Sequence, residues 1–153
     1  MKVYFASPFF NPEQVEREER LKAKLRSVGL DVWSPKESCH LKMDDPVEKQ
    51  EDTFKNNIDS ITNADIIFTV TDGKDMGTIW EAGFANGFNS ASSKHIIVVY
   101  YCETLPPGGK FNVMLARSGD LIYTKFEDLD NICDDIEKFM SSGTKRTYSG
   151  NIE

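Results

Sequence analysis

The stretch that decides the fold is ADIIFTVTDGKDMGTIWEAG, residues 64–83. Its first eight residues are rich in β-branched and aromatic side chains, which is typical of a buried strand. The polar segment DGKDMG follows as a loop, and TIWEAGFANGF, residues 78–88, predicts a helix. A strand that leads through a short loop into a helix is the repeating unit of an α/β fold.

The same alternation continues on both sides of this stretch. Asn11 and Pro12 suit the start of a helix, and Gly29 suits its end. The polar residues 35–46 are expected to form a loop that could act as a flap. Further strands are predicted at residues 3–7, 30–34, 94–101 and 121–124, and further helices at residues 12–28, 47–62, 112–116 and 126–140.

Strands that are separated by helices pair in parallel through right-handed crossovers. Five such strands predict a flavodoxin-like, doubly wound parallel sheet in the order 2-1-3-4-5, with helices on both faces. We expect one domain over residues 1–153. Ligands of such sheets bind beyond the carboxyl ends of the strands, at the switch point between strands 1 and 3. The segments SPFFN, residues 7–11, and DGKDMGTIWE, residues 72–81, are therefore expected to line the ligand site.

Two carboxylates fall at this place in the predicted sheet. Glu81 is expected near the first turn of its helix, where the macrodipole favours the ionised carboxylate. It is either a helix-start residue without a chemical role or a nucleophile. Asp75, in the preceding loop, is either a capping residue or an acid. Two carboxylates in different environments suit glycosyl transfer, in which one attacks the anomeric carbon and the other assists the leaving group.

Aromatic side chains are predicted beside these carboxylates. Tyr4, Phe9, Phe10 and Trp80 are expected to cluster near the cleft, and core packing is the alternative for each of them. Phe9 and Phe10 follow a proline outside the first strand, where burial in the core is less natural. We therefore expect these two rings to be able to stack on a planar base.

The glycines and histidines point to no cofactor or metal. Gly77, Gly83 and Gly87 belong neither to a GxGxxG motif after the first strand nor to a Walker motif. Gly83 and Gly87 are instead predicted to allow close packing against the sheet or a neighbouring chain. His40 and His95 are isolated from any triad or metal-binding pattern and receive no role.

The composition favours a small neutral ligand over nucleic acid. The net charge is −7, whereas binding to a phosphate backbone requires clustered Lys and Arg. The three cysteines match no metal spacing and indicate free thiols in a reducing compartment. The first residues hold too short an apolar run for a signal peptide, and no run is long enough to span a membrane. We expect a cytoplasmic protein.

Four sequence blocks together resemble the nucleoside 2-deoxyribosyltransferases. These blocks are KVYFASPFF (2–10), NNIDSITNADIIFTVTDG (56–73), DMGTIWEAGFANG (75–87) and FNVML (111–115). Each block alone is a weak signal, but the four in this order are specific. The resemblance implies transfer of 2-deoxyribose from one purine or pyrimidine base to another, with retention of configuration.

The resemblance also implies roles for individual residues. Glu81 matches the nucleophile, which would attack C1′ of the deoxynucleoside and form a covalent ester. Asp75 matches the acid that exchanges a proton with the base, and Tyr4 matches the hydroxyl that orients the nucleophile. Asn112 and Met114 match residues lent by an adjacent subunit, with the asparagine holding the 5′-hydroxyl. A shared site implies a homo-oligomer built from dimers, commonly a hexamer.

Two positions depart from the family pattern. Some members carry a ligand-positioning aspartate in the helix before strand 3, where this chain has Asn57, with Asp59 two residues on. Some members fold a C-terminal aromatic carboxylate into the site, whereas this chain ends in TYSGNIE and offers Tyr148. The substrate-binding residues that we predict are Ser7, Phe9, Phe10, Asn57, Gly77, Trp80, Asn112 and Met114.

Two other functions remain open at this point. The first is an N-glycosidase that acts on a deoxyribonucleoside or deoxyribonucleotide and uses water as the acceptor. The segment SPFFNPE lacks extra serine, glycine or basic residues for a 5′-phosphate, which disfavours the nucleotide. The second is a non-catalytic nucleotide-binding module. For either enzyme, the expected partners are small molecules, namely deoxyribonucleosides and free bases.

Overall fold

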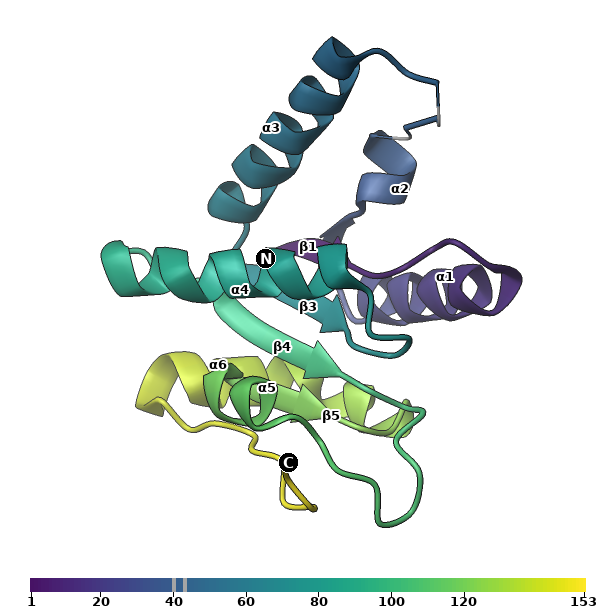
Figure 1. Ribbon diagram of the computed structural model, residues 1–153. Coiled ribbons are helices and arrows are strands. Elements are labelled where there is room, and N and C mark those ends of the chain that lie inside the picture. Colours follow the sequence, from purple (N-terminus) through teal and green to yellow (C-terminus); the bar gives the residue numbers. More distant parts are fainter. Residues whose placement is uncertain (40, 43) are drawn as a thin grey trace.

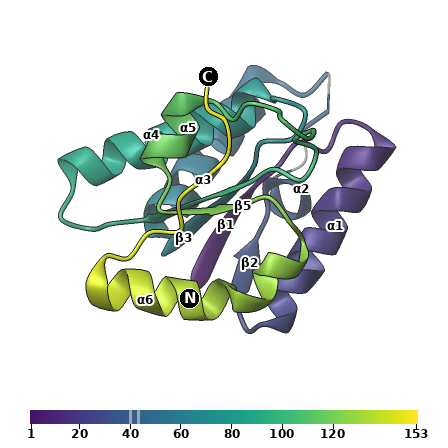
Figure 2. The ribbon, with the colours of Figure 1, turned by 90° about the horizontal axis from the view of Figure 1, so that it is seen from below.

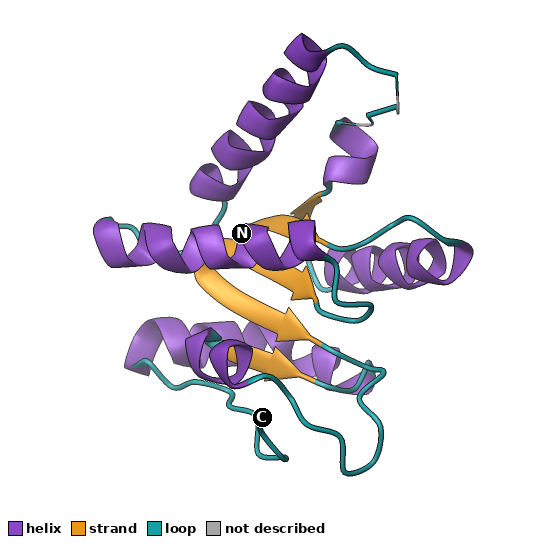
Figure 3. Ribbon diagram, viewed as in Figure 1, coloured by secondary structure: helices purple, strands orange, loops and turns teal. Residues whose placement is uncertain are grey.

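The computed structural model describes residues 1–39, 41–42 and 44–153 and contains a five-stranded parallel sheet. The strand order is β2-β1-β3-β4-β5, as predicted (Figure 1). All four strand pairs are parallel (Figure 3). The strands are β1 (Lys2–Ala6), β2 (Asp31–Trp33), β3 (Ile66–Val70), β4 (Ile97–Tyr101) and β5 (Leu121–Tyr123).

Helices cover both faces of this sheet (Figure 2). One face carries α1 (Pro12–Ser27) and α6 (Ile132–Ser142), and the other carries α3 (Val47–Asn63), α4 (Met76–Ala91) and α5 (Val113–Ser118). Side chains alternate across each strand, so the strands divide the core into two layers. Val3 and Phe5 face the α1–α6 layer, whereas Tyr4 and Ala6 face the α3–α5 layer. Tyr4 therefore points toward the helix that carries Glu81.

Local sequence explains where the helices near the site begin. The Asn11 side chain caps α1 by accepting a hydrogen bond from the Gln14 amide at 2.9 Å. Before α4, Gly73 and Lys74 both have positive φ, 83° and 52°, which turns the chain sharply after β3. Asp75 then caps α4. The β3–α4 loop thus begins with a turn at Gly73 and Lys74 and ends at the Asp75 cap of α4.

Two predicted boundaries differ from the structure. The loop predicted at residues 35–46 begins with a short helix, α2 (Pro35–Ser38). Four residues carry no helical periodicity, and α2 is held by its ion pairs to α1. The helix predicted at residues 126–140 is divided into the 3-10 helix η1 (Glu127–Asn131) and α6. His40, which was given no role, lies outside the described residues.

An ion-pair cluster attaches α2 to α1. The Glu37 carboxylate accepts hydrogen bonds from Lys22 at 2.8 Å and from Arg26 at 2.7 Å. The bonds from Arg26 and Lys22 lower the pKa of Glu37 to about 2. Lys22 is fully buried and also pairs with Glu18 at 3.2 Å. The segment that follows β2 is therefore anchored by charge rather than by apolar packing.

The outer side of α4 corrects one prediction. Gly83 and Gly87 are exposed, and a Cβ atom at either position would meet no described atom within 4 Å. They therefore do not serve close packing against the sheet; Ala82 and Ala85 fill that role.

The cysteines Cys39, Cys102 and Cys133 are free thiols. Within the described part of the chain, no helix has the length and apolar character needed to cross a membrane.

Candidate active site

The centre of the candidate site is a hydrogen bond between Tyr4 on β1 and Glu81 on α4. The tyrosine hydroxyl donates to Glu81 Oε1 at 2.6 Å. Tyr4 is almost fully buried, and burial, followed by the neighbouring Glu81 charge, raises the pKa of its phenol. The phenol therefore stays protonated and acts as a fixed donor that leaves the second oxygen of Glu81 available.

The charge state of Glu81 differs from the prediction. Burial, together with the nearby Asp75 charge, raises the pKa of Glu81 to about 7, although the hydrogen bond from Tyr4 opposes this shift. Glu81 is the sixth residue of α4 and lies in its second turn, where the macrodipole is weaker than at the first turn. Desolvation of the Glu81 carboxylate therefore outweighs its stabilisation by the macrodipole of α4. Near neutral pH, both the ionised and the protonated forms of Glu81 are populated.

Asp75 lies at the start of the same helix and does cap it. Its Oδ2 atom accepts a hydrogen bond from the Thr78 amide at 2.8 Å. A Cβ atom on Gly77 would lie only 3.3 Å from this oxygen, so the glycine gives the carboxylate room. Capping uses Oδ2 alone among the described contacts. Asp75 Oδ1 is thus left for a ligand, and the Asp75 carboxylate lies close enough to help raise the pKa of Glu81.

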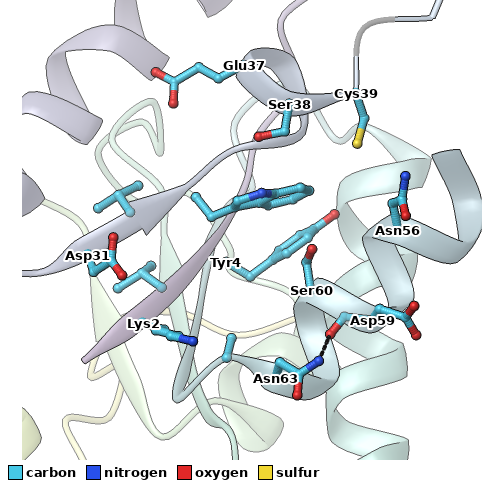
Figure 4. Close-up of a pocket in the computed structure, with 14 residues that line it drawn as sticks. Lys2, Tyr4, Asp31, Glu37, Ser38, Cys39, Asn56, Asp59, Ser60 and Asn63 are labelled. Atoms are coloured by element: carbon cyan, nitrogen blue, oxygen red, sulfur yellow. Dashed lines mark hydrogen bonds between the residues drawn. The ribbon is translucent and has the colours of Figure 1, made fainter.

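A cavity of about 630 Å³ lies beside this pair, between strands β1–β2 and helix α3. Tyr4 belongs to both features, because its ring lines the cavity and its hydroxyl reaches Glu81. The Cys39 and Asn56 side chains lie on the side of the Tyr4 hydroxyl, whereas Lys2 and Asn63 lie at the other end of the cavity (Figure 4). Neither Glu81 nor Asp75 lines the cavity, so Tyr4 is the residue that links it to the carboxylate pair.

Sequence reasoning missed Trp33 as part of this cavity. Trp33 is the register partner of Tyr4, and the two rings stack with centroids 5.1 Å apart and an interplanar angle of 28°. Pairing of the first two strands puts alternate residues on the same face. If the sequence had given the register in which residues 3–7 pair with residues 30–34, it would have predicted that Trp33 lies beside Tyr4. Cys39 and Asn56 carried no sequence signal.

The predicted aromatic cluster is divided in the structure. Phe9 and Phe10 stack on each other at 5.2 Å, and the Phe10 amide donates to Gln14 at 2.8 Å. Trp80 instead packs against Phe84 at 5.7 Å, on the outer side of α4. Phe10 and Trp80 are both exposed. Tyr4, the Phe9–Phe10 pair and Trp80 are thus three separate aromatic groups.

Ser7 and Asn57, the remaining residues predicted in the β1 loop and on α3, are less exposed than Phe10 and Trp80. Ser7 is buried, and its hydroxyl donates to the Pro8 carbonyl at 3.2 Å, so it supports the turn. Asn57 is half-buried, and its Oδ1 atom is buried without a hydrogen-bond partner among the described residues. Asp59 lines the cavity. An acceptor without a partner is unusual in a protein interior and marks Asn57 as a candidate ligand contact.

Asn112 and Met114 lie at the start of α5, in the connection between β4 and β5. Asn112 caps α5 by accepting from the Met114 amide at 3.0 Å, and the Met114 side chain is 72% exposed. α5 lies beside β5, whereas Tyr4 belongs to β1, with β3 and β4 between them (Figure 1). Strands are about 4.8 Å apart, so these residues lie roughly 14 Å across the sheet from Tyr4.

The C-terminal segment joins the same region as α5. Phe111 pairs with Ile152 through backbone hydrogen bonds, and the Tyr148 ring packs against Phe111 at 5.2 Å. Tyr148 therefore packs on the α5 side of the sheet and makes no described contact with Glu81. Among the described residues, no group of three or more His, Cys, Asp or Glu side chains has a metal-binding arrangement.

The comparisons with known proteins agree with this geometry. A family model described as nucleoside 2-deoxyribosyltransferase matches residues 3–132. A solved structure of a 2-deoxyribosyltransferase from Bacillus psychrosaccharolyticus is 26% identical, with a TM-score of 0.77 over 97% of this chain and 99% of that one. A conserved protein from Enterococcus faecalis V583 shares the fold, with 18% identity, a TM-score of 0.56 and coverage of 97% and 80%. No curated protein matches the sequence significantly.

The five-stranded parallel sheet in the order 2-1-3-4-5, with helices on both faces, defines a doubly wound α/β protein. The chain belongs to the nucleoside 2-deoxyribosyltransferase family.

Proposed function

We propose that this protein exchanges the base of 2′-deoxyribonucleosides by a retaining double displacement through Glu81. The observation that carries this proposal is the 2.6 Å hydrogen bond from Tyr4 to Glu81, which lies near the Asp75 charge. The Tyr4 ring also lines the neighbouring cavity. In the first step, the free oxygen of ionised Glu81 forms a bond to C1′ while the bond from C1′ to the base nitrogen breaks. The leaving base takes a proton from Asp75.

The second step reverses the first with a different base. The incoming base nitrogen attacks C1′, the ester bond to Glu81 breaks, and Asp75 takes the proton that the base loses. Tyr4 keeps one Glu81 oxygen in a hydrogen bond throughout, because its raised pKa holds the phenolic proton. No proton is gained or lost over the full exchange. The single-domain chain, 1–153, carries all three of these groups.

The cavity supplies a place for the base. Its volume, about 630 Å³, falls in the range of small-molecule sites. We propose that Asn57 contacts the base, since its buried acceptor has no described partner. Phe9, Phe10, Trp80, Ser7 and Gly77 do not line this cavity, and we propose that they contact the substrate on the side of Glu81 and Asp75. Water must be kept from the covalent ester until a base arrives.

The site would be completed by a second subunit. Asn112 and Met114 are exposed, and no described hydrogen bond joins either of them to Glu81, which supports a role toward a neighbouring copy. Asn112 of one chain would then hold the sugar 5′-hydroxyl in the site of another. This arrangement requires a homo-oligomer. A fully active monomer at micromolar concentration would exclude it.

The test is a chromatographic assay with thymidine plus adenine, run beside thymidine alone. We expect deoxyadenosine in the first reaction and little free deoxyribose in the second. Equal release of thymine and deoxyribose in both would make the protein a hydrolase. If the protein turned over neither thymidine nor deoxyinosine but still bound these ligands, it would be a non-catalytic binding module.

Glu81 variants test the covalent step. Glu81→Ala and Glu81→Gln should each lose several orders of magnitude in rate, because the nucleophile is removed. Glu137→Gln, an exposed glutamate on α6, is the matched control and should keep the wild-type rate. Turnover by Glu81→Ala within tenfold of wild type would rule out Glu81 as the nucleophile.

A further inference from the structure

The carboxylate of Asp72, at the carboxyl end of β3, is buried and has no part in the proposed chemistry. Asp72 is only 2% exposed. Its Oδ1 atom accepts a hydrogen bond from the Thr104 amide at 2.7 Å, and its Oδ2 atom accepts one from the Glu103 amide at 3.2 Å. Burial of a charged group is costly unless hydrogen bonds satisfy it, and these two backbone donors do so. Asp72 therefore ties the end of β3 to the segment that follows β4.

Helix α1 supports the same contact. Arg17 is nearly buried, and its Nε atom donates a hydrogen bond to Glu103 Oε1 at 2.8 Å. Burial lowers the pKa of the Arg17 guanidinium, but its hydrogen bonds to carboxylates and the charge of Asp72 raise this pKa above its ordinary value. The positive charge of Arg17 thus offsets the negative charge that Asp72 brings into the protein. Glu103 is held by α1 through its side chain and by Asp72 through its amide.

The turn between Asp72 and Asp75 has little conformational freedom. Only Gly73 and Lys74 lie between them, and both have φ in the left-handed region, at 83° and 52°. This conformation is uncommon for a lysine, and it persists where the surrounding structure fixes it. A Cβ atom on Gly73 would lie 3.2 Å from Gln14 Nε2, so α1 blocks one side of the turn. A displacement of Asp72 would therefore move Asp75 as well.

We infer that Asp72 is a positioning residue for Asp75, because it anchors the β3–α4 loop to two backbone amides beyond β4. This role rests on the proposed function, in which Asp75 exchanges a proton with the base. Asp72 makes no described contact with Glu81, so it acts on the reaction only through Asp75. Misplacement of a reacting group by about 1 Å can cost about 100-fold in rate. The anchor therefore keeps the acid within reach of the base nitrogen.

A matched pair of variants at Thr104 tests the anchor and leaves the Asp72 charge in place. Thr104 is exposed, and Thr104→Pro removes the amide hydrogen that Asp72 binds, whereas Thr104→Ala keeps it. Thr104→Pro should lower kcat for transfer from thymidine to adenine about tenfold, with KM for thymidine within about twofold of the wild type. Thr104→Ala should keep the wild-type kcat. Equal kcat values for the two variants would overturn the inference.

Asp72→Asn tests the anchor from the side of β3. The new amide keeps one acceptor oxygen but presents N–H groups to the second backbone donor, so one of the two bonds is lost. We expect kcat to fall about 10- to 100-fold while KM changes about twofold or less. A higher KM with an unchanged kcat would overturn the inference, since Asp72 would then contribute to binding and not to the placement of the acid. If Asp72→Asn does not fold, the Thr104 pair decides.

An NMR titration of the Glu81 carboxyl carbon reports the position of Asp75 without any turnover. Burial and the Asp75 charge raise the pKa of Glu81 to about 7, and the Tyr4 hydroxyl opposes them. If the anchor is lost, repulsion between the two carboxylates moves Asp75 away. The pKa of Glu81 should then fall in both Thr104→Pro and Asp72→Asn. An unchanged pKa of Glu81 in both variants would overturn the inference.

The Asp75→Asn background separates an effect through Asp75 from a direct effect of Asp72. In this background, Asp72→Asn should cause no further change in the pKa of Glu81, because the charge that it would displace is already absent. A change of equal size in both backgrounds would overturn the inference. The titration needs no substrate, so it decides on the anchor even if the assay with thymidine and adenine shows no transfer. Failure of the anchor and failure of the proposed function are thus distinguishable.

Discussion

The hydroxyl of Tyr4, the third residue of β1, donates a 2.6 Å hydrogen bond to the Glu81 carboxylate on α4, 77 positions further along the sequence. This bond favours the ionised carboxylate, whereas burial favours the neutral acid. The balance between the two brings the pKa of Glu81 to about 7. The ionisation of the proposed nucleophile, Glu81, therefore depends on the competition between desolvation and the hydrogen bond from Tyr4.

Tyr4→Phe should move the pH profile of the first chemical step. Loss of the donor raises the pKa of Glu81 above 7, so the ionised fraction at pH 7 falls. We expect a loss of about 10- to 100-fold in kcat at pH 7, the range for a hydrogen bond to a charged group, and partial recovery at pH 9. The pH dependence of kcat/KM for thymidine measures this shift. Tyr148→Phe is the control, and an unshifted profile for Tyr4→Phe would contradict the assignment.

Asp75 combines a structural and a proposed chemical role, and two variants separate them. Asp75→Asn keeps a helix cap but loses the acid, so the transfer rate should fall about 100-fold or more while stability is nearly unchanged. Asp75→Ala loses both, and its free energy of unfolding should fall by about 1 kcal/mol as well. Urea unfolding and the transfer assay measure the two effects. Wild-type turnover by Asp75→Asn would make Asp75 a capping residue only.

Asn57→Leu should have opposite effects on stability and on substrate binding. The Asn57 Oδ1 acceptor is buried without a partner among the described residues, so an apolar side chain of similar size relieves that cost. The melting temperature without ligand should stay equal or rise. KM for the nucleoside should rise about tenfold, as for one lost hydrogen bond. A lower melting temperature with an unchanged KM would mean that Asn57 supports the fold alone.

The Glu37 anchor of α2 predicts a specific acid sensitivity. The folded pKa of about 2 lies below the ordinary value of 4.5, so this group stabilises the protein above pH 4.5. That contribution is lost as the pH falls from about 4.5 to 2. The wild type should be more stable than Glu37→Gln at pH 6, and the difference should disappear near pH 2. Thermal unfolding across this range is the measurement, and a constant difference would contradict the anchor.

The fold was predictable from the sequence, because alternating strands and helices leave few topologies for a parallel sheet. The strand order 2-1-3-4-5 followed from that alternation and is confirmed. α2 was missed, since a four-residue helix has no periodicity and is held by charges from α1. Gly83 and Gly87 were predicted to pack against the sheet or a neighbouring chain, and the helical spacing from Ala82 and Ala85 excludes the sheet.

The candidate site was only partly predictable. The place of Glu81 and Asp75 at the switch point followed from the strand order, and the role of the Tyr4 hydroxyl came from the family resemblance. The structure brings Tyr4 and Glu81 together. The prediction that the helix start favours ionised Glu81 was wrong, because the burial of this carboxyl group depends on neighbours that are distant in sequence. Trp33 was missed for the same reason, since its contact with Tyr4 depends on strand register. Sequence patterns predict where a helix starts, but they do not predict the solvent exposure of the side chains there.

The length of the cavity has a consequence for the choice of acceptor. It extends from Tyr4 to Lys2 and Asn63, along the strands and away from Glu81. A flat ring seated at the Tyr4 end would leave the remaining space unfilled. Bases that carry long substituents on the edge opposite the sugar would occupy it. We therefore expect this protein to tolerate such synthetic bases as acceptors, and bulk added near the glycosidic nitrogen to be rejected.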